Sequence, residues 1–416
     1  MFDLDRWQEI IAVLRKNKLR TALTAFGVLW GILMLVLMLG AGTGLENGIK
    51  SNFGGTATNS FFVWAQRTTK PYMGLPPNRS FRYTNEDAIA IKKIPELDVV
   101  CPRNQIGGYR SANQVIRGKK SGAFNVMGDY PDVLKIEPKP IVQGRFINDL
   151  DIDNQRKVIV IGEYVKDILF EEDENPIGEF VGINGIYFKV IGVFGTHRSG
   201  ERARDETKSL HIPFTTFQKS FNYGNTVGFF AITSKPNIPA SEAEELVIAL
   251  LKERHKISPD DQMAVGHFNL EKEYNKFMGL FDGINILVWF VGIFTIIAGA
   301  IGVSNIMLIV VKERTKEIGI RRAIGARPAT IISQIMLESI FLTTIAGYTG
   351  LVIGVLIWQA VEGAIGEGNG TFANPQVDFN VAMIALGVLV VTGAIAGLMP
   401  ANRAVSISTV DALRTE

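Results

Sequence analysis

The sequence contains a single cysteine, Cys101, and only four histidines in 416 residues. One cysteine excludes an intramolecular disulfide and a cysteine-rich zinc site. The histidines show no HxH or HxxxH spacing, so we expect no metal site built on them. The formal net charge is +2, which gives no excess of positive charge for binding nucleic acid.

Sequence motifs for catalysis are also missing. The segment 195–200 has the glycine spacing of a phosphate-binding loop, but Glu201 and Arg202 follow it where lysine and serine or threonine are needed. No G-x-S-x-G nucleophile motif occurs. We therefore expect that this chain is not an enzyme and binds no cofactor of its own.

Charged residues make up 20% of the chain, against about 25% in soluble domains, and the deficit lies in four uncharged runs. Each run exceeds the roughly 20 apolar residues that a helix needs to cross a bilayer. They predict transmembrane helices at 21–45, 283–311, 339–361 and 379–402. The first run is too long for a signal peptide. No run carries an ionisable residue near its middle, which argues against an ion-coupled carrier or pump.

The distribution of Lys and Arg between the spans predicts the orientation of the chain. Residues 1–20 carry five, the loop 312–338 carries six, and the loop 362–378 carries none. Because positive residues stay on the cytoplasmic side, both termini (1–20 and 403–416) and the loop 312–338 are predicted to be cytoplasmic. Residues 46–282 form a large domain on the other side.

The outer domain, 46–282, is predicted to be α+β. Strand-like runs are 61–65, 158–162, 185–194 and 227–233. Asn184-Gly185 lies between two alternating apolar runs and predicts a hairpin. Helices are predicted from Thr84 to Ile94, capped by Thr84, and from Ser241 to His255, capped by Ser241 with Glu244 three residues later.

The outer domain also shows a weak internal repeat of strand, helix and strand. Strand 61–65, helix 85–94 and strand 97–101 correspond to strand 227–233, helix 241–255 and strand 262–268. We therefore predict one split α/β unit from residues 46–128 and 209–270, with a β-rich subdomain, 129–208, inserted. The fold class is a membrane protein with four transmembrane helices and a large α+β extracytoplasmic domain between the first and second helices.

Small residues recur at four-residue spacing in three of the spans. They are Gly27 and Gly31 in the first, Ala346, Gly350 and Gly354 in the third, and Gly393 and Gly397 in the fourth. Such faces let helices approach closely in lipid. They fit packing within one chain as well as a seam between two copies.

The predicted cytoplasmic loop alternates charged and apolar residues. Its sequence from Val311 is VKERTKEIGIRRAIGARP, ending at Pro328. We predict a helix along the membrane face with its isoleucines inward and its charges toward the cytosol. Pro328 suits the first turn of the next helix. Near the N-terminus, apolar residues that include Trp7 fall on one helix face, which predicts an interfacial helix anchored by Trp7 in membrane lipid.

Several segments resemble the MacB/FtsX-like ABC transporter permeases. Residues 313–326, ERTKEIGIRRAIGA, are similar to the E-R-T-x-E-I-G-I-R-x-A-x-G-A stretch of that family. The segment 17–24, the hairpin 178–193 and the tail 400–414 also resemble family segments, although Thr409 stands where proline is commoner. The four-span topology with one large insertion matches as well, so the resemblance covers essentially the whole chain.

The resemblance implies a mechanotransmission permease of the inner membrane, with its large domain in the periplasm. It implies a dimer, with a second copy or a paralogue, and ATPase subunits that hold ATP and Mg²⁺. About 20 residues precede the first span, so we expect the ATPase to be a separate chain. The first two spans would extend outward as a stalk near 40–52 and 270–284, and a periplasmic adaptor and an outer-membrane channel are further expected partners.

The resemblance also implies a coupling site for the ATPase in the loop 312–327. The residues that we assign to it are Glu313, Arg314, Glu317, Ile318, Ile320, Arg321 and Arg322. Charge complementarity favours Glu317, Arg321 and Arg322 as contacts, while Ile318 and Ile320 are the alternative anchors. Transport or extraction of a substrate is the leading hypothesis. An FtsX-like regulator of a cell-wall hydrolase and a lipoprotein-releasing permease remain alternatives.

Overall fold

A computed structural model describes residues 18–53, 55–106, 113–196, 198, 200–365, 375 and 379–406. The chain divides into a membrane unit (Met1–Gly48, Leu280–Gly366 and Phe372–Glu416) and an outer unit (Ile49–Gly279 and Glu367–Thr371). The predicted interfacial helix with Trp7, most of the loop 362–378 and the tail beyond 406 lie outside the described residues.

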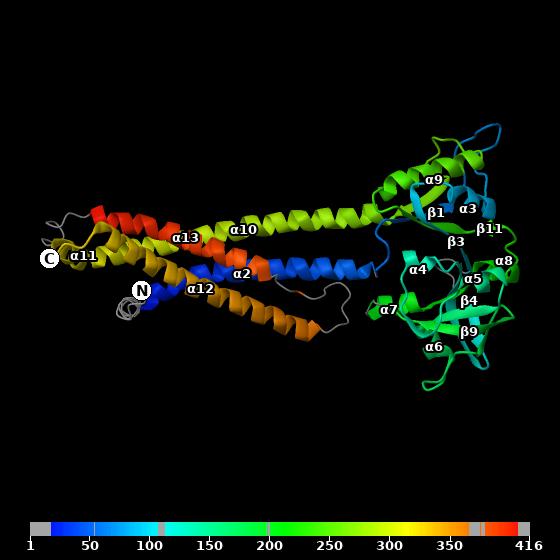
Figure 1. Cartoon of the computed structure of the whole chain (residues 1–416), viewed down its shortest axis with the longest axis horizontal. Coiled ribbons are helices and arrows are strands. Elements are labelled where there is room, and N and C mark those ends of the chain that lie inside the picture. The colour runs from blue at the N-terminus through cyan, green and yellow to red at the C-terminus, as the bar shows by residue number, and fades with distance from the viewer. Residues whose placement is uncertain are drawn as a thin grey trace. The chain divides into compact units, whose positions relative to one another are not determined.

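The four predicted transmembrane helices are confirmed in the membrane unit (Figure 1). They are α2 (Lys18–Asn52), α10 (Leu270–Glu313), α12 (Pro328–Ile365) and α13 (Phe379–Ser406). The helix α10 has 44 residues, a length of about 66 Å at about 1.5 Å per residue. That is about twice the thickness of a bilayer core. The helices α2 and α10 contain the segments that we predicted as a stalk, and just beyond α2 the ring of Phe53 contacts Tyr274 and Phe277.

Most of the predicted small residues lie where two helices of the same chain approach. A Cβ added at Gly350 would lie 2.6 Å from the backbone oxygen of Leu29 in α2, so α2 and α12 touch at backbone level there. Gly31, Gly354, Gly393 and Gly397 also face a neighbouring helix closely, and Ala346 is buried. Gly27 differs, because its missing Cβ would meet open space.

Four strands of the outer unit form a sheet in the order β3-β12-β1-β13, with all neighbours antiparallel. They are β1 (Ser60–Ala65), β3 (Leu97–Ile106), β12 (Phe229–Ser234) and β13 (Val265–Asn269). The helix α3 (Asn85–Ile91) connects β1 to β3, and α9 (Ala240–Arg254) connects β12 to β13. Each of these two β-α-β halves therefore encloses a strand of the other, which is the split β-α-β arrangement. We call this part the split-sheet lobe.

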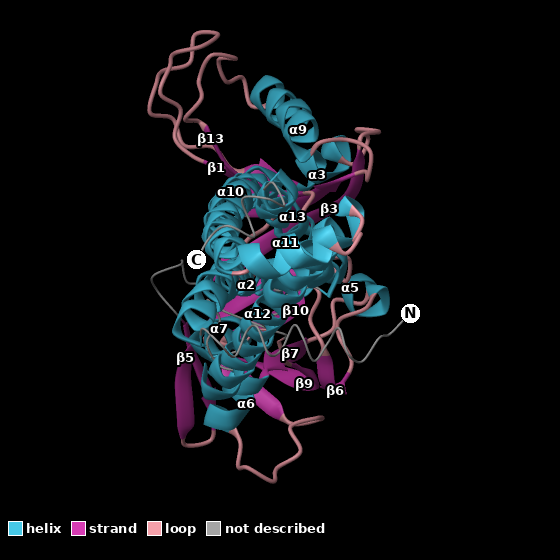
Figure 2. Ribbon diagram, turned by 90° about the vertical axis from the view of Figure 1, so that its left-hand side faces the viewer, coloured by secondary structure: helices cyan, strands magenta, loops and turns pink. Residues whose placement is uncertain are grey.

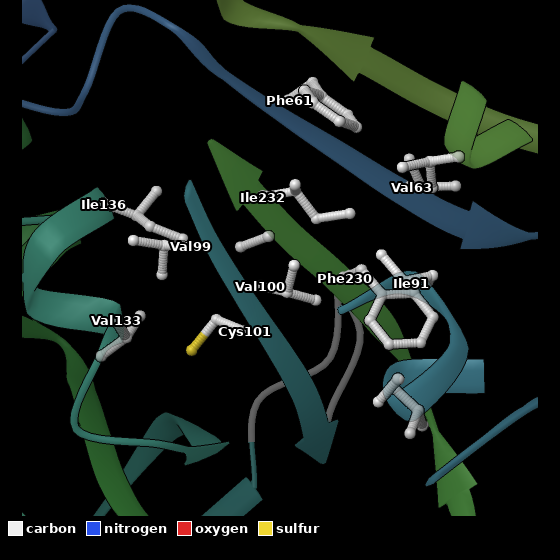
Figure 3. Close-up of a cluster of buried hydrophobic side chains, with 14 of the residues drawn as sticks. Phe61, Val63, Ile91, Val99, Val100, Cys101, Val133, Ile136, Phe230 and Ile232 are labelled. Carbon is white, nitrogen blue, oxygen red and sulfur yellow. The ribbon is translucent and has the colours of Figure 1, made fainter. Parts of the chain in front are cut away.

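The core of the split-sheet lobe fills both faces of its sheet. Phe61 pairs with Ile232 and Val63 with Phe230, and these side chains point to one face with Ile91 of α3 (Figure 3). On the opposite face, Cys101 and Val99 pack against Val133 and Ile136 of the short helix α4 (Val133–Ile136) (Figure 3). Burial raises the pKa of the Cys101 thiol to about 12, so this cysteine stays protonated and unreactive.

The remaining strands of the outer unit close into a ring. The pairings run β10-β7-β9-β8-β4-β5 and return from β5 to β10, so the ring has no free edge among these six strands. The strands are β4 (Asn113–Arg117), β5 (Lys120–Asp129), β7 (Val158–Gly162), β8 (Phe180–Ile183), β9 (Ile186–Phe194) and β10 (Ser209–Pro213). A second cluster of buried apolar side chains belongs to them. We call this part the ring lobe (Figure 2).

Shorter elements complete the outer unit. They are β2 (Tyr83–Thr84), β6 (Ile141–Gly144) and β11 (Thr226–Val227), with helices α5 (Asp149–Asp153), α6 (Glu163–Leu169), α7 (Gly200–Thr207) and α8 (Phe214–Ser220). The strand β3 belongs to both lobes, because Leu97–Arg103 pairs with β12 whereas Asn104–Ile106 pairs with β5.

The predicted boundaries of the inserted subdomain differ from the structure. We placed residues up to 128 and from 209 in the split α/β unit, but β4, β5 and β10 pair with strands of the ring lobe. The ring lobe therefore begins after about residue 103 and ends at about residue 213. The repeat in the sequence could not show this, because ring closure depends on pairing between β5 and β10, which lie about 80 residues apart.

The predicted hairpin and the first predicted helix cap are confirmed. Asn184 and Gly185 both have positive φ and join β8 to β9. Thr84 and Asp87 form a capping box at the start of α3. Burial alone would raise the pKa of Asp87, but hydrogen bonds from His255, Arg254 and the Thr84 backbone lower it to about 2.

The predicted cap at Ser241 is wrong. The helix α9 begins at Ala240 with Pro239 as its N-cap, and the Ala240 N–H donates to the Glu271 carboxylate instead (2.7 Å). Glu244, which we expected to complete the cap, is buried and its carboxylate receives hydrogen bonds from the side chains of His267 and Asn269 in β13. Side chains distant in the sequence therefore make the hydrogen bonds that we expected between Ser241 and Glu244.

Candidate functional site

The predicted coupling segment forms a separate short helix, α11 (Thr315–Ala323), between α10 and α12. The chain leaves helical geometry at Arg314, whose φ of −95° and ψ of 10° separate α10 from α11. At the other end Gly325 has a φ of +105°. The Ala326 N–H reaches back to the Arg321 carbonyl and the Gly325 N–H to the Arg322 carbonyl, a Schellman motif. Pro328 then starts α12 as predicted.

An ion pair fastens the start of α11 to α12. The Arg314 guanidinium donates to the buried Glu338 carboxylate at 3.0 Å and to Glu317 at 3.1 Å. Burial alone would lower the pKa of Arg314, but these two carboxylates raise it, so the guanidinium stays charged. Because Arg314 is the residue between α10 and α11, this contact links three helices at one point.

Further contacts hold the second half of α11. Arg321 donates to Gln334 in α12 (2.9 Å) and pairs with Glu317 one turn earlier (2.9 Å). Arg322 donates to the Val405 carbonyl near the end of α13 (2.7 Å). Ile318 is buried beneath the helix. The segment is thus attached to its own membrane unit along its whole length.

The prediction that the isoleucines of this loop point inward is wrong for two of the three. Ile318 is 9% exposed, whereas Ile320 is 43% and Ile324 82% exposed. Positions 320, 323 and 324 fall on one side of a helix at spacings of three and four residues, and Ala323 is also exposed. Together they form an outward apolar stripe (Ile320, Ala323 and Ile324). Ile318 lies on the opposite side, because two residues advance a helix by about 200°.

The assignment of Glu317, Arg321 and Arg322 to ATPase contacts stays a prediction. All three already bond within the chain, so an ATPase would have to share or exchange these partners. Glu313 lies exposed at the end of α10. The sequence reading missed Glu338, Gln334 and Gly325. Gly325 carried a signal, since glycine just after a helical segment commonly marks its end. The other two carried none, because they lie in the next helix.

The histidines and carboxylates of the described residues were the other candidates for a site. Within these ranges no three His, Cys, Asp or Glu side chains converge as metal ligands. The histidines that the structure describes each face a carboxylate: His211 faces Asp129, His255 faces Asp87 and His267 faces Glu244. These contacts are those of structural histidines.

Comparisons with known proteins match two parts of the chain, one that contains most of the outer unit and one that contains α11. A family model described as a MacB-like periplasmic core domain matches residues 21–250, and a model described as an FtsX-like permease C-terminal domain matches residues 289–409. The second match contains α11 with its apolar stripe. The first covers more than half of the chain.

Among similar curated proteins is the pyoverdine export ATP-binding/permease protein PvdT of Pseudomonas entomophila, 29% identical over 96% of this chain and 58% of its own length. Another is the macrolide export ATP-binding/permease protein MacB of a Shewanella species, 26% identical over 99% of this chain and 61% of its own. The chain thus spans about three fifths of these relatives.

Among solved structures, the periplasmic region of MacB from Actinobacillus actinomycetemcomitans matches 55% of this chain and 97% of its own length, with 23% identity and a TM-score of 0.43. Both family models match this chain, and the fold shows four membrane helices with the outer unit inserted between the first and the second. This chain belongs to the MacB/FtsX-like family of ABC transporter permeases.

Proposed function

We propose that this chain is the permease subunit of an ABC transporter that couples ATP hydrolysis by a separate ATPase subunit to a conformational change of its outer domain. That change would drive export or extraction of a substrate outside the membrane. In this proposal both termini and α11 face the cytoplasm and the outer unit faces the periplasm. The relatives named as export ATP-binding/permease proteins support this choice over regulation of a hydrolase.

The outward apolar stripe on α11 is the observation that carries the proposal. A helix that presents Ile320, Ala323 and Ile324 to solvent, rimmed by Lys316 and Arg327, has the form of an apolar anchor with a charged border. Apolar side chains that cluster at this exposure are typical of a protein contact site. The ATPase subunit is the partner that the family supplies for this position.

The attachments of α11 explain how a push on it would reach the outer domain. Arg314 and Glu338 tie α11 to α10 and α12, and Arg322 ties it to α13. The helix α10 is unbroken from Leu270 to Glu313, and its first ten residues belong to the outer unit. A continuous helix transmits displacement along its axis because every turn is hydrogen-bonded to the next. We infer that movement of α11 would move α10 as a rigid element.

No membrane-buried charge is needed in this mechanism, because the substrate does not cross the bilayer through the permease. We propose that two permease chains, identical or paralogous, act with two ATPases that hold ATP and Mg²⁺. The exposed Gly27 on α2 is available for such a contact between chains, since among the described residues outside its own helix turn nothing lies within 4 Å of its missing Cβ.

The test is co-purification in lipid nanodiscs with a separately expressed cognate ATP-binding subunit. We expect a stable complex whose ATP hydrolysis rises at least severalfold over that of the isolated ATPase. A catalytically dead ATPase with its Walker-A lysine replaced should still bind but give no hydrolysis. If no ATP-binding subunit associates with the permease, the transporter proposal fails. If a complex forms but a cell-wall hydrolase is activated in its presence without transport, the regulatory alternative replaces it.

A further inference from the structure

The outer unit contains a cavity of about 290 Å³ where its two lobes meet. The split-sheet lobe contributes Phe62, Arg103 and Phe229, and the ring lobe contributes Met127, His211 and Glu206. Residues directly paired across antiparallel strands point to the same face of the sheet. The pairs are Phe62 with Ala231, Trp64 with Phe229, and Phe229 with Arg103. Phe62, Phe229 and Arg103 therefore share one face, the face opposite α3 and α9. The volume is at the lower end of the range of about 300–1,000 Å³ typical of small-molecule sites.

Buried ion pairs form the floor of this cavity. Arg103 is 3% exposed, and its guanidinium donates to both Asp129 oxygens (2.5 and 3.3 Å) and to Glu137 (2.7 Å). His211 contacts the same Asp129 carboxylate at 2.6 Å. Burial lowers the pKa of His211, so its ring is neutral at pH 7 despite the neighbouring carboxylate. The positive charge of Arg103 is therefore matched within the floor.

The second cation of the cavity is matched as well. The Lys139 ammonium lies 3.6 Å from Glu206 and 3.9 Å from Glu137, and its side chain is 5% exposed. Glu206 also lies 3.5 Å from Arg198 and accepts a hydrogen bond from Thr196. Neither cation has an unmatched charge to offer an anionic ligand.

Asp205 gives the cavity its surplus charge. It lies exposed in α7, beside Glu206, and lines the cavity. Among the residues that the structure describes, no ion pair or hydrogen bond engages its carboxylate. The charged groups that line the cavity, together with their direct ion-pair partners, comprise four carboxylates and three cations. The carboxylates are Asp129, Glu137, Asp205 and Glu206, and the cations are Arg103, Lys139 and Arg198. One negative charge is left over.

The apolar wall complements this charge. Phe62 and Phe229 are only partly buried although they are large aromatic residues, and Met127 also lines the cavity. The Phe229 ring already has the Arg103 guanidinium 5.4 Å from its centroid, so its face attracts cations. An aromatic wall beside an unmatched carboxylate suits a ligand that carries both an apolar body and a positive charge.

We propose that this cavity binds a small organic cation: an amine whose ammonium group lies beside Asp205 and whose apolar body packs against Phe62 and Phe229. The assignment of such a ligand as transported substrate rests on the proposed function, whereas the binding itself does not require an ATPase.

The test uses tryptamine as the probe, with the full-length chain in lipid nanodiscs and no ATPase or ATP present. Isothermal titration calorimetry should show saturable binding of tryptamine at neutral pH. The uncharged analogue 3-ethylindole and the anionic analogue indole-3-propionate should bind at least tenfold more weakly. Equal binding of the three compounds, or binding of none, overturns the proposal.

Variants locate the binding. Asp205→Asn should weaken tryptamine binding about twofold to fivefold, and Asp205→Lys should weaken it further. Because Asp205 is exposed, neither variant should disturb the fold. Phe62→Ala should weaken all three compounds. Glu253→Gln, an equally exposed charge on α9 across the sheet, should leave the affinity unchanged. Unchanged binding in both Asp205 variants overturns the proposed site. ATPase association is measured in a separate experiment. A failure of tryptamine binding therefore does not contradict the proposed function, and a failure of ATPase association does not contradict the proposed binding site.

Discussion

Replacing the apolar stripe of α11 should weaken binding of the ATPase subunit without unfolding the permease. In the double variant Ile320→Ser and Ile324→Ser, two side chains lose the apolar area that the ATPase would bury. Full burial of an isoleucine contributes about 1.5–3 kcal/mol. Scaled by the exposed fractions of 43% and 82%, the two together contribute about 2–4 kcal/mol. This corresponds to roughly a 20- to 500-fold increase in Kd.

The assay is titration of the purified ATPase subunit onto the permease in nanodiscs, with Kd measured for the parent and the variant. The conservative variant Ile320→Val with Ile324→Val should bind nearly as the parent does. A charge exchange, Glu317→Arg with Arg321→Glu, keeps opposite charges at these two positions and tests the contacts that charge complementarity favoured. Because it also removes the contacts of Glu317 with Arg314 and of Arg321 with Gln334, the thermal midpoint of this variant is measured beside its Kd. The thermal midpoint of the isolated permease should fall only slightly in the serine variant, since Ile324 is 82% exposed and only the packed part of Ile320 is lost.

Two outcomes would refute the reasoning. A change in Kd of less than about threefold in the serine variant would show that the stripe is not buried by the ATPase. A larger loss in the charge exchange than in the serine variant would mean that ionic contacts determine the affinity, as the sequence first indicated. In either case the contact surface would have to be moved to the charged side of α11.

Three further predictions concern stability and packing. Glu338→Gln removes the buried carboxylate that anchors α11 and should cost about 1.5–3 kcal/mol, lowering the thermal midpoint in nanodiscs. Glu317→Gln at a half-exposed position should cost less than about 1 kcal/mol. Asp87 has a folded-state pKa of about 2 against about 3.9 in an unfolded chain. Its contribution of about 2.5 kcal/mol is therefore complete above about pH 5 and is mostly lost as the pH falls to about 2. The stability difference between the parent and Asp87→Asn, measured by acid unfolding of the outer domain, should nearly vanish at that pH. Gly350→Leu should prevent close packing of two membrane helices and reduce the yield of folded protein in detergent, while Gly27→Leu should leave the folded yield unchanged.

Much of the membrane unit could be predicted from the sequence. Lipid offers no hydrogen bonds to the backbone, so a long uncharged run must be helical, and four such runs specified four helices. Helix ends were less accurate. The predicted third span began at residue 339, whereas α12 begins at Pro328. The uncharged run used to place the span ends at Glu338, but the helix continues past this charge because Glu338 is buried and paired with Arg314.

Local signals in the outer domain were reliable where they depended on a few adjacent residues. The Asn184-Gly185 turn and the Thr84 capping box are formed by backbone conformations that these residues favour by themselves. The Ser241 cap failed because Pro239 started the helix earlier and the Glu271 carboxylate took over the first N–H group. A side chain 31 positions away cannot be read from a local pattern.

The sequence by itself determined the number of membrane helices, the insertion of one outer domain between the first two, and the presence of a helical segment between the second and third helices. Only the tertiary structure decided which isoleucines of α11 face outward, that Arg314 pairs with Glu338, and that β5 and β10 close the ring lobe. The physical reason is the range of the interactions. Hydrophobic periodicity and turn conformation act over a few residues, whereas helix rotation, buried ion pairs and strand pairing depend on groups that come together only when the chain folds.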